Sequence, residues 1–319
     1  PRALATAGVG AAAASAPLAV YGQQVYPELP AALACLAGVV ALTGPRGRPV
    51  LLGLAVVTLP WLSIKYAPVA VVLAALGVLG RWRAGDRRAA TWFTAAMAAA
   101  AAGYAAVHVA IWGGLTVYAS GDHFQQSGQL GVMGEGPSFG FRSWRLIDLL
   151  VDRTFGLVAW QPAWLLLVPA LAALVVSRHV PHRAALVVPL AAGWLVATYP
   201  ALTMHGYWWP GRQVVVVLPL ALLVMLAWLA GQGRAVRLTA AVLAAAGVFT
   251  YGCLLVDGHT GDVAWVNHFQ HADAPVHHLL HPVLAHYGTT TSNVIWLGLT
   301  ALLAAAGIAL TRRRTSPAR

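Results

Sequence analysis

An arginine that follows a cluster of aromatic residues and opens an apolar run is the feature of this sequence that most directly points to chemistry. Residues 205–219 place four polar or aromatic side chains shortly before Arg212: His205, Tyr207, Trp208 and Trp209. A charge costs roughly 2.5–3.5 kcal/mol at the centre of a bilayer, so such an arginine either snorkels to the interface or meets an anion. We interpret this corner as the binding site of a negatively charged, lipid-linked substrate. An interfacial aromatic belt is the alternative.

Two further isolated charges fit an anion-binding site. Lys65 is the only lysine, is followed by Tyr66, and lies between two short apolar segments, where its ammonium requires an anion or water. Phosphate suits it, because lysine binds phosphate as a point charge, and we assign Lys65 and Tyr66 as substrate contacts. Glu28 stands at the predicted start of an apolar helix and is our candidate catalytic or metal-binding carboxylate. A solvated carboxylate favoured by the helix dipole is the alternative for Glu28.

A third group of charges belongs to a short helix that the pattern predicts to lie on the membrane, with Ser143 as its cap. Asp148 and Asp152 are four residues apart, so both carboxylates share one helix face and need a nearby cation. We expect Arg145 to supply this cation in an internal ion pair. Asp152 and Arg153 are predicted to line the outer cleft as substrate contacts.

Histidines gather in the segment 257–291, which holds seven of the twelve in the chain. If these stretches are helical, His268 with His271 and His277 with His281 place two imidazoles on one face, as a metal site requires. A divalent metal is therefore left open as a cofactor, although no set of metal ligands is assigned. A polar outer loop without metal is the alternative.

The composition shows which solvent these charges face. The chain has 319 residues, of which 59% are apolar and 9% charged, whereas soluble domains carry about 25% charged residues. So much apolar surface requires a bilayer as solvent. The formal net charge of +11 does not indicate nucleic-acid binding, because the arginines form short clusters between apolar runs rather than one basic face.

We predict an all-α fold, a polytopic transmembrane helix bundle of about ten spans that forms a single domain over 1–319, with outer loops 120–154 and 257–291. The candidate spans are 3–22, 29–44, 49–64, 66–80, 89–118, 155–177, 184–203, 212–231, 235–256 and 292–311. With the amino terminus in the cytoplasm, fifteen of the twenty basic residues fall on the inner side, as the positive-inside rule requires. Both termini are then cytoplasmic, and all the candidate residues above face outward.

The segments 49–64 and 66–80 are short for spans, so we expect their shared tip at Lys65 to be recessed in a cavity. The chain begins with Pro1 and Arg2 rather than methionine. We therefore expect it to be part of a longer protein, with earlier spans missing.

Three motifs on the predicted outer side resemble the polytopic glycosyltransferases that use polyprenyl-phosphate sugars, known as the GT-C fold. The likeness is greatest to Ala- and Arg-rich membrane proteins of actinobacteria. Residues 26–33, YPELPAAL, resemble the acidic residue that opens an apolar helix in these enzymes. Residues 152–157, followed by Gln161 and Pro162, resemble the junction after their outer interfacial helix. Residues 208–220 resemble their aromatic and arginine entry into a late span with an internal proline.

This resemblance implies an integral protein of a bacterial plasma membrane that transfers a sugar from a polyprenyl-phosphate donor to an acceptor on the extracytoplasmic side, or an inactive homologue of such an enzyme. It makes Glu28 an active-site acid or metal contact, and makes Lys65 and Arg212 contacts to the lipid phosphate. All three should then converge on one outward cavity. The implied partners are the polyprenyl-phosphate-linked sugar and membrane lipid, with no nucleic acid.

One departure from the family pattern matters for this interpretation. These enzymes usually keep a catalytic aspartate in the first outer loop, which is missing if the chain begins at the third span. Two other classes of protein stay open as alternatives. One is a transporter or flippase of a lipid-linked or small substrate, and the other is a membrane scaffold protein that uses 257–291 as its contact surface.

Overall fold

The computed structural model describes residues 2–44, 48–120, 137–177, 182–262 and 272–315. These residues form helices and one isolated β-bridge, and they contain no strand, so the predicted all-α class is confirmed for this part of the chain. The α-helices are α1 (Arg2–Ala13), α2 (Leu18–Tyr21), α3 (Glu28–Thr43), α4 (Pro49–Leu62), α5 (Ala67–Arg83), α6 (Arg87–Trp112), α7 (Phe139–Arg142), α8 (Arg145–Val151), α9 (Leu157–Trp160), α10 (Leu167–Val176), α11 (Arg183–Thr198), α12 (Leu218–Ala230), α13 (Arg234–Thr260), α14 (Pro275–Leu280) and α15 (Thr290–Thr315). The short 3-10 helices are η1 (Ile64–Tyr66), η2 (Val117–Ser120), η4 (Pro162–Leu166) and η5 (Arg212–Val217).

Several of these helices have the length and composition of membrane spans, which is compatible with an integral membrane protein. The 5 segments in the described ranges that are long and apolar enough to cross a bilayer are Ile64–Arg83, Arg87–Trp112, Arg212–Ala230, Arg234–Thr260 and Thr290–Arg312. Shorter apolar helices are Glu28–Thr43, Pro49–Leu62, Pro162–Val176 and Arg183–Thr198. At a rise of about 1.5 Å per residue, a helix as short as α3 covers only part of the roughly 30 Å of hydrocarbon.

Two of the predicted spans are divided near a proline, so the prediction of continuous helices was wrong there. The span 3–22 is divided into α1 and α2, and Pro17, which has no N–H for a helical hydrogen bond, immediately precedes α2. The span 155–177 is divided into α9, η4 and α10. Its backbone is extended at Gln161, because the residue before a proline disfavours helical geometry, and Pro162 then begins η4.

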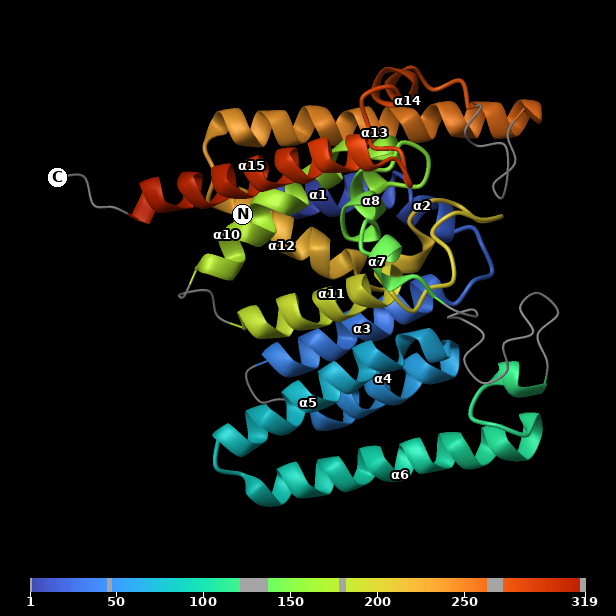
Figure 1. Ribbon diagram of the computed structural model, residues 1–319. Helices are drawn as coiled ribbons and strands as arrows, with labels where there is room; N and C mark the ends of the chain where they lie inside the picture. The colour runs from blue at the N-terminus through green and yellow to red at the C-terminus, as the bar shows by residue number, and fades with distance from the viewer. Residues whose placement is uncertain (1, 45–47, 121–136, 178–181, 263–271, 316–319) are drawn as a thin grey trace.

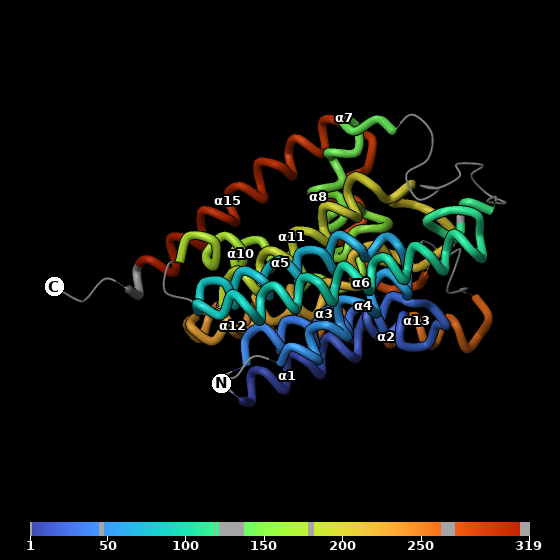
Figure 2. The backbone as a smooth tube through the Cα atoms, turned by 90° about the horizontal axis from the view of Figure 1, so that it is seen from below, coloured from blue at the N-terminus to red at the C-terminus, as the bar shows by residue number. Residues whose placement is uncertain are grey.

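The long helices lie side by side with roughly parallel axes, with α13 along one edge of the bundle and α6 along the other (Figure 1). The end of α5, the start of α11, the turn between α12 and α13, and the end of α15 all lie at one end of the bundle, on the left in Figure 1. Figure 2 shows the ends of α5 and α15 toward the same end of the bundle as the start of α1, while α2 lies toward the opposite end. The described residues that flank the predicted inner loops therefore lie at one end of the bundle.

The segment formed by η5 and α12 runs through the core of the bundle. Val214, Val217 and Leu218 are fully buried, as a span enclosed by other helices requires. Gly211 precedes this segment with φ of 81°, a left-handed conformation that glycine adopts without a steric penalty. A side chain at Gly211 would also approach Leu157 to 2.7 Å, so the local chain path that leads into Arg212 depends on glycine.

The helix that was predicted to lie on the membrane is instead packed inside the protein. It begins at Arg145, and the Ser143 hydroxyl donates to the Phe139 carbonyl instead of capping it. Leu149 on its apolar face is buried, as expected, but so are Arg145 and Asp148 on its polar face. Other parts of the protein cover that polar face, including α11 and α15, so neither lipid nor water is its neighbour.

Candidate functional site

Three residues that are far apart in the sequence, Glu28, Lys65 and Arg212, meet at one point. Lys65 Nζ donates a hydrogen bond to Glu28 Oε1 at 2.9 Å, and Arg212 Nε donates to the same oxygen at 2.8 Å. The Glu28 side chain is fully buried, whereas the side chains of Lys65 and Arg212 are 15% and 23% exposed. The structure thus brings together the three residues that the sequence analysis expected to converge, and we call them the ion triad.

The ion triad forms because three chain segments start at the same end of the bundle (Figure 1). Glu28 is the first residue of α3, Lys65 lies in η1 between α4 and α5, and Arg212 is the first residue of η5. A helix start favours a negative charge and disfavours a positive one. Two cations at helix starts therefore need a counter-ion, and the Glu28 carboxylate provides it for both.

The two cations of the ion triad also lie close to aromatic rings. The guanidinium carbon of Arg212 lies 4.3 Å from the ring centroid of Tyr26 and 5.3 Å from that of Trp208. Lys65 Nζ lies 5.0 Å from the ring centroid of Tyr66. Cations are attracted to aromatic faces at these distances, most strongly where water is excluded. The aromatic cluster before Arg212 therefore contributes directly to the position of this arginine.

A cavity of about 890 Å³ opens beside the ion triad, within the usual size range of small-molecule sites. Lys65 and Arg212 line it, whereas Glu28 does not and lies behind them. The other lining side chains are Tyr26, Pro27, Pro60, Trp61, Leu62, Ser63, Ile64, Tyr104, His108, Thr116, Val117, Val196, Pro200, Ala201, Leu202, Thr203, Tyr207, Trp208 and Gln213, together with Gly206. Since none of these described lining residues is acidic, the wall carries two positive charges against one hidden negative charge, and it suits an anion.

The other predicted contacts near the ion triad divide into two groups. Tyr207 and Trp208 line the cavity, and Tyr207 is 82% exposed. Trp209 does not line it; its ring is fully buried, 4.9 Å from that of Trp160. Tyr66 is also buried behind the wall. Trp209 and Tyr66, which were expected to be substrate contacts, thus pack in the core of the bundle and do not line the cavity.

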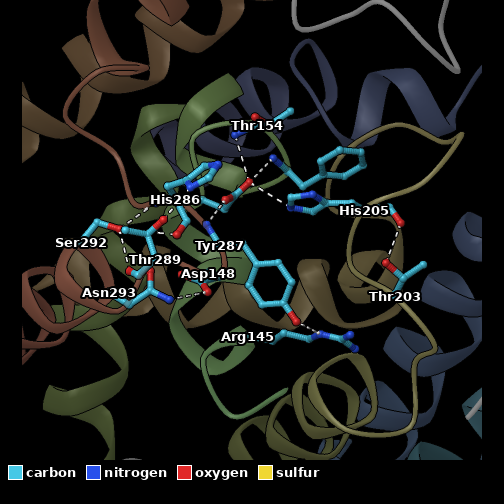
Figure 3. Close-up of polar contacts among 12 residues, drawn as sticks. Arg145, Asp148, Thr154, Thr203, His205, His286, Tyr287, Thr289, Ser292 and Asn293 are labelled. Atoms are coloured by element: carbon cyan, nitrogen blue, oxygen red, sulfur yellow. Dashed lines mark hydrogen bonds and ion pairs between the residues drawn. The ribbon is translucent and has the colours of Figure 1, made fainter. Parts of the chain in front are cut away.

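Asp152 belongs to a second polar cluster, which includes His205 (Figure 3). Asp152 Oδ2 accepts hydrogen bonds from the main-chain N–H groups of Thr154 at 3.0 Å and Phe155 at 2.7 Å, and Oδ1 accepts one from Tyr287 at 2.9 Å. His205 Nε2 lies 3.5 Å from Oδ2, and the His205 ring stacks on Phe155 with centroids 4.5 Å apart. Burial raises the pKa of Asp152, but the hydrogen bonds from His205 and the main chain outweigh burial and lower it.

Asp152 therefore joins chain segments, and the structure does not support its predicted role as a substrate contact. It forms a bridge with Ala285, and the main-chain N–H of Arg153 donates to the Ala285 carbonyl at 2.8 Å. Asp152, Arg153 and His205 do not line the cavity. His205 is still linked to the cavity through its neighbours. Gly206 is part of the lining, and the His205 carbonyl accepts a hydrogen bond from the hydroxyl of Thr203, another lining residue, at 2.8 Å.

The contacts of Arg145 in the described part of the chain do not include the predicted internal ion pair, because Arg145 points away from the aspartates of its helix. Its guanidinium donates to the carbonyls of Ala201 at 2.7 Å and Leu202 at 3.2 Å, just after the end of α11. Cations are favoured at the carbonyl end of a helix. Arg145 thus fastens α8 to the end of α11, and Tyr287 Oη accepts a further bond from its Nε at 3.0 Å.

Asp148 is left without a cation and bonds to a neutral amide instead. Asn293 Nδ2, on α15, donates to Asp148 Oδ2 at 3.2 Å, and Asp148 is fully buried (Figure 3). Burial is the largest cause that raises the pKa of Asp148 to about 7, and the negative charge of Asp152 is the second. The hydrogen bond from Asn293 lowers this pKa, but by less than the other two raise it. Asp148 and Asp152 are thus two neighbouring carboxyl groups with pKa values shifted in opposite directions.

The histidine-rich segment gives no metal centre in the described part of the chain. His268 and His271 lie outside the described residues. His277 donates through Nδ1 to the Ala159 carbonyl at 3.2 Å and stacks on Trp160 with centroids 4.1 Å apart, and burial lowers its pKa to about 4. Among the described residues, no group of three or more His, Cys, Asp or Glu side chains is placed to hold a metal ion. The divalent metal stays a prediction without an assigned ligand set.

Sequence reasoning missed the wall of the cavity formed by Trp61 of α4 with Tyr104 and His108 of α6. Ring centroids are 5.3 Å apart for Trp61 and Tyr104, 5.4 Å for Trp61 and His108, and 3.8 Å for Tyr104 and His108. The signal that was available is the spacing of four residues between Tyr104 and His108, which puts both on one helix face in an otherwise Ala-rich stretch. We call these three residues the aromatic wall.

The fold and the site thus define a helical protein with membrane-span-like helices and a cavity whose two cations share one buried carboxylate. The chain matches no protein-family model, no curated protein and no solved structure. The resemblance to the GT-C glycosyltransferases stays a prediction from the sequence motifs alone.

Proposed function

We propose that this protein is an integral protein of a bacterial plasma membrane and binds a polyprenyl-phosphate-linked sugar in the cavity beside Lys65 and Arg212. It acts as a glycosyltransferase of the GT-C type or is an inactive relative of one. The observation that carries this proposal is that both cations face one cavity and share the Glu28 carboxylate behind it. The triad has a net formal charge of +1, which an anion bound in the cavity would balance.

The chemistry of sugar transfer fits this arrangement. When a sugar leaves a lipid phosphate, negative charge develops on the phosphate oxygen, and fixed cations in a site shielded from water stabilise it. Lys65 offers a point charge and Arg212 offers further N–H donors, since only its Nε is bound to Glu28. The nucleotide pockets that other glycosyltransferases need are unnecessary here, because the donor arrives in the membrane.

We propose a positioning role for Glu28 rather than the catalytic role inferred from its sequence. Glu28 Oε1 accepts from both cations, and its side chain lies behind the cavity wall. A general base must reach the proton that it removes, within about 2.6–3.2 Å or through one water. Glu28 instead sets the distance between Lys65 and Arg212 and keeps both charged.

The proposal includes the predicted orientation, with ten apolar segments that alternate in direction, both termini in the cytoplasm and the cavity on the extracytoplasmic side. Few polar residues lie within the predicted spans, among them His108, Gln161 and Thr198. The proposal is preferred to a transporter or flippase because Gln161 and Thr198 are bonded to their neighbours, while His108 lines the cavity. Gln161 Nε2 donates to the Ser15 hydroxyl at 2.8 Å, and the Thr198 hydroxyl donates to the Trp194 carbonyl at 2.9 Å. A polar transport path would need such groups to face a passage.

Binding of farnesyl phosphate, a short polyprenyl phosphate, to the purified protein in lipid nanodiscs tests the proposal. Titration calorimetry or native mass spectrometry gives the dissociation constant. We expect Lys65→Met and Arg212→Gln to weaken binding at least about tenfold each, because a hydrogen bond to a charged group contributes roughly 1.5–3 kcal/mol. Arg212→Lys keeps the charge but loses the fork of donors, and an intermediate affinity is expected.

Arg83→Gln is the matched control, since it removes one positive charge at the opposite end of the same apolar segment, Ile64–Arg83. It should bind farnesyl phosphate like the wild type. Farnesol, which has no phosphate, should bind weakly to all variants. Equal affinities of the wild type, Lys65→Met and Arg212→Gln for farnesyl phosphate would overturn the proposed binding site, provided that thermal unfolding shows all three to be folded.

A further inference from the structure

The cavity has two chemically different sides. Lys65 and Arg212 form a cationic side, whereas Trp61, Tyr104 and His108 form the aromatic wall. The Trp61 side chain is well exposed, with 49% of its surface accessible, and it meets the edges and faces of the other two rings. A phosphate needs only the cationic side, so the aromatic wall is left for the remainder of a substrate.

The hydrogen bonding of His108 gives its ring a defined polarity. Nδ1 lies 2.9 Å from the Tyr104 carbonyl, one helical turn earlier, and because a carbonyl only accepts, Nδ1 carries the proton. A neutral imidazole with a proton on Nδ1 has a free electron pair on Nε2. Within the described chain the Nδ1 bond is the hydrogen bond that His108 makes, and its side chain is 8% exposed yet lines the cavity.

His108 Nε2 is thus an acceptor that is accessible from the cavity, and a hydroxyl or amide donor of a bound ligand can satisfy it. Carbohydrates combine such hydroxyl groups with apolar C–H faces that pack on aromatic rings, and the aromatic wall offers both a ring face and an acceptor. A prenyl chain packed on the rings would cover Nε2 without offering it a donor, and burying a polar atom without a partner is unfavourable.

We infer that the aromatic wall is the carbohydrate subsite of this cavity, where His108 Nε2 accepts a hydrogen bond from a hydroxyl of the donor sugar and Trp61 packs against the sugar ring. This inference rests on the proposed function, since the cationic side must first hold the lipid phosphate. It adds three residues from α4 and α6 to the site and assigns each end of the substrate to one side of the cavity.

The test compares farnesyl phosphate with farnesyl phosphates that carry D-mannose, D-glucose, D-galactose or D-arabinofuranose, all titrated into the protein in nanodiscs. The ratio of the two dissociation constants measures what the sugar adds to binding. For at least one sugar, the wild type should bind the glycosylated probe about three- to tenfold more tightly, as expected for one hydrogen bond and a ring contact. His108→Phe keeps a flat aromatic ring but removes the acceptor, and should bring this ratio close to one.

Trp61→Leu should reduce the same ratio, whereas Trp92→Leu should leave it unchanged. Trp92 is a matched control, because it is a tryptophan on α6 that is 66% exposed and does not line the cavity. None of these variants should alter the affinity for farnesyl phosphate by more than about twofold. If His108→Phe unfolds, His108→Gln replaces it as the test of the acceptor. If Trp61→Leu unfolds, Trp61→Phe replaces it as the test of the ring contact.

Three results would overturn the subsite, and they differ in how much of the proposed function they leave standing. Equal binding of glycosylated and plain probes by the wild type removes the carbohydrate subsite but keeps the phosphate site. Equal loss of affinity for both probes in His108→Phe shows that the aromatic wall contacts the prenyl chain. Absence of farnesyl phosphate binding by the wild type removes the proposed function itself, and the subsite with it.

Discussion

Replacing Glu28 with glutamine removes the charge that Lys65 and Arg212 share while it keeps the size of the side chain. Both cations are hydrogen-bonded to Glu28 Oε1, at 2.9 and 2.8 Å, so the two donor nitrogens lie less than about 6 Å apart. Without the carboxylate, two positive charges at this separation repel each other by about 3 kcal/mol at an effective dielectric constant of about 20. Removing one partner of a buried ion pair typically destabilises a protein by about 3–5 kcal/mol.

We therefore expect Glu28→Gln to lower the free energy of unfolding by about 3 kcal/mol. The informative comparison is with the double variant that adds Lys65→Met. The second substitution removes the repulsion and leaves Arg212 with the same net charge that the wild-type triad has. Lys65→Met should thus destabilise the wild-type protein but stabilise the Glu28→Gln protein, which is a reversal of sign and not only a change in size.

Denaturant unfolding of the four proteins in one detergent and at one pH measures these free energies. Asp86→Asn is the control, because it makes the same chemical change at an exposed carboxylate that caps α6 through the Ala89 N–H at 2.9 Å. Asparagine caps helices as well as aspartate does, so the control should change stability by less than about 0.5 kcal/mol. A double variant that is less stable than Glu28→Gln would refute the claim that this carboxylate is the counter-ion of both cations.

The remaining predictions concern the second cluster and the orientation in the membrane. Burial, and then the charge of Asp152, hold the pKa of Asp148 at about 7, so the folded protein keeps a proton that the unfolded chain releases near pH 4. The stability that this proton contributes is lost as the pH rises from about 4 to 7. Asp148→Asn should therefore gain stability relative to the wild type between about pH 5 and pH 8. A difference in unfolding free energy between the two proteins that does not change with pH would contradict this. In a Cys253→Ser background, a membrane-impermeant thiol reagent should label Tyr207→Cys in intact cells and Ala84→Cys only after permeabilisation, because both positions are exposed and the proposed orientation puts them on opposite sides of the membrane. The reverse labelling pattern would show that the cavity faces the cytoplasm.

The convergence of the ion triad was predictable because charges are scarce in this chain. With only 9% charged residues, a lone lysine, a glutamate at a helix start and an arginine at the mouth of a span have few partners to choose from. Burial without a partner is so unfavourable that they must either reach water or meet one another. The alternation of span directions then places Glu28, Lys65 and Arg212 at the same end of the bundle.

The partners of Arg145 were not predictable by the same reasoning. The rule that side chains four residues apart face each other suggested an ion pair within α8. The structure pairs this arginine with main-chain carbonyls at the end of α11, more than fifty residues later in the chain. No side-chain pattern encodes an acceptor of this kind, because every helix end presents the same unpaired carbonyls. Only the tertiary packing decides which helix end a given arginine reaches.

The breaks in the predicted spans show a similar limit. Hydropathy alone treats 155–177 as one apolar run, yet Gln161 and Pro162 interrupt it. The gap is tolerated because the Gln161 side chain accepts the N–H of Ala163 at 3.2 Å and donates to Ser15 at 2.8 Å. Non-helical backbone inside a membrane protein persists where protein groups satisfy it, and here one such group is Ser15, which lies between α1 and α2, far from Gln161 in the sequence.

The placement of Glu28 behind the cavity also explains how two cations can face a membrane-level cavity whether or not an anion is present. A lysine and an arginine that relied on the substrate alone would repel each other each time it left, and the site would relax. Because Glu28 is fully buried and bonded to both, the cationic side keeps its geometry and one net positive charge in either state. Under the proposed function, the phosphate therefore enters a prepared site, and the free energy of its binding is not spent on bringing Lys65 and Arg212 together.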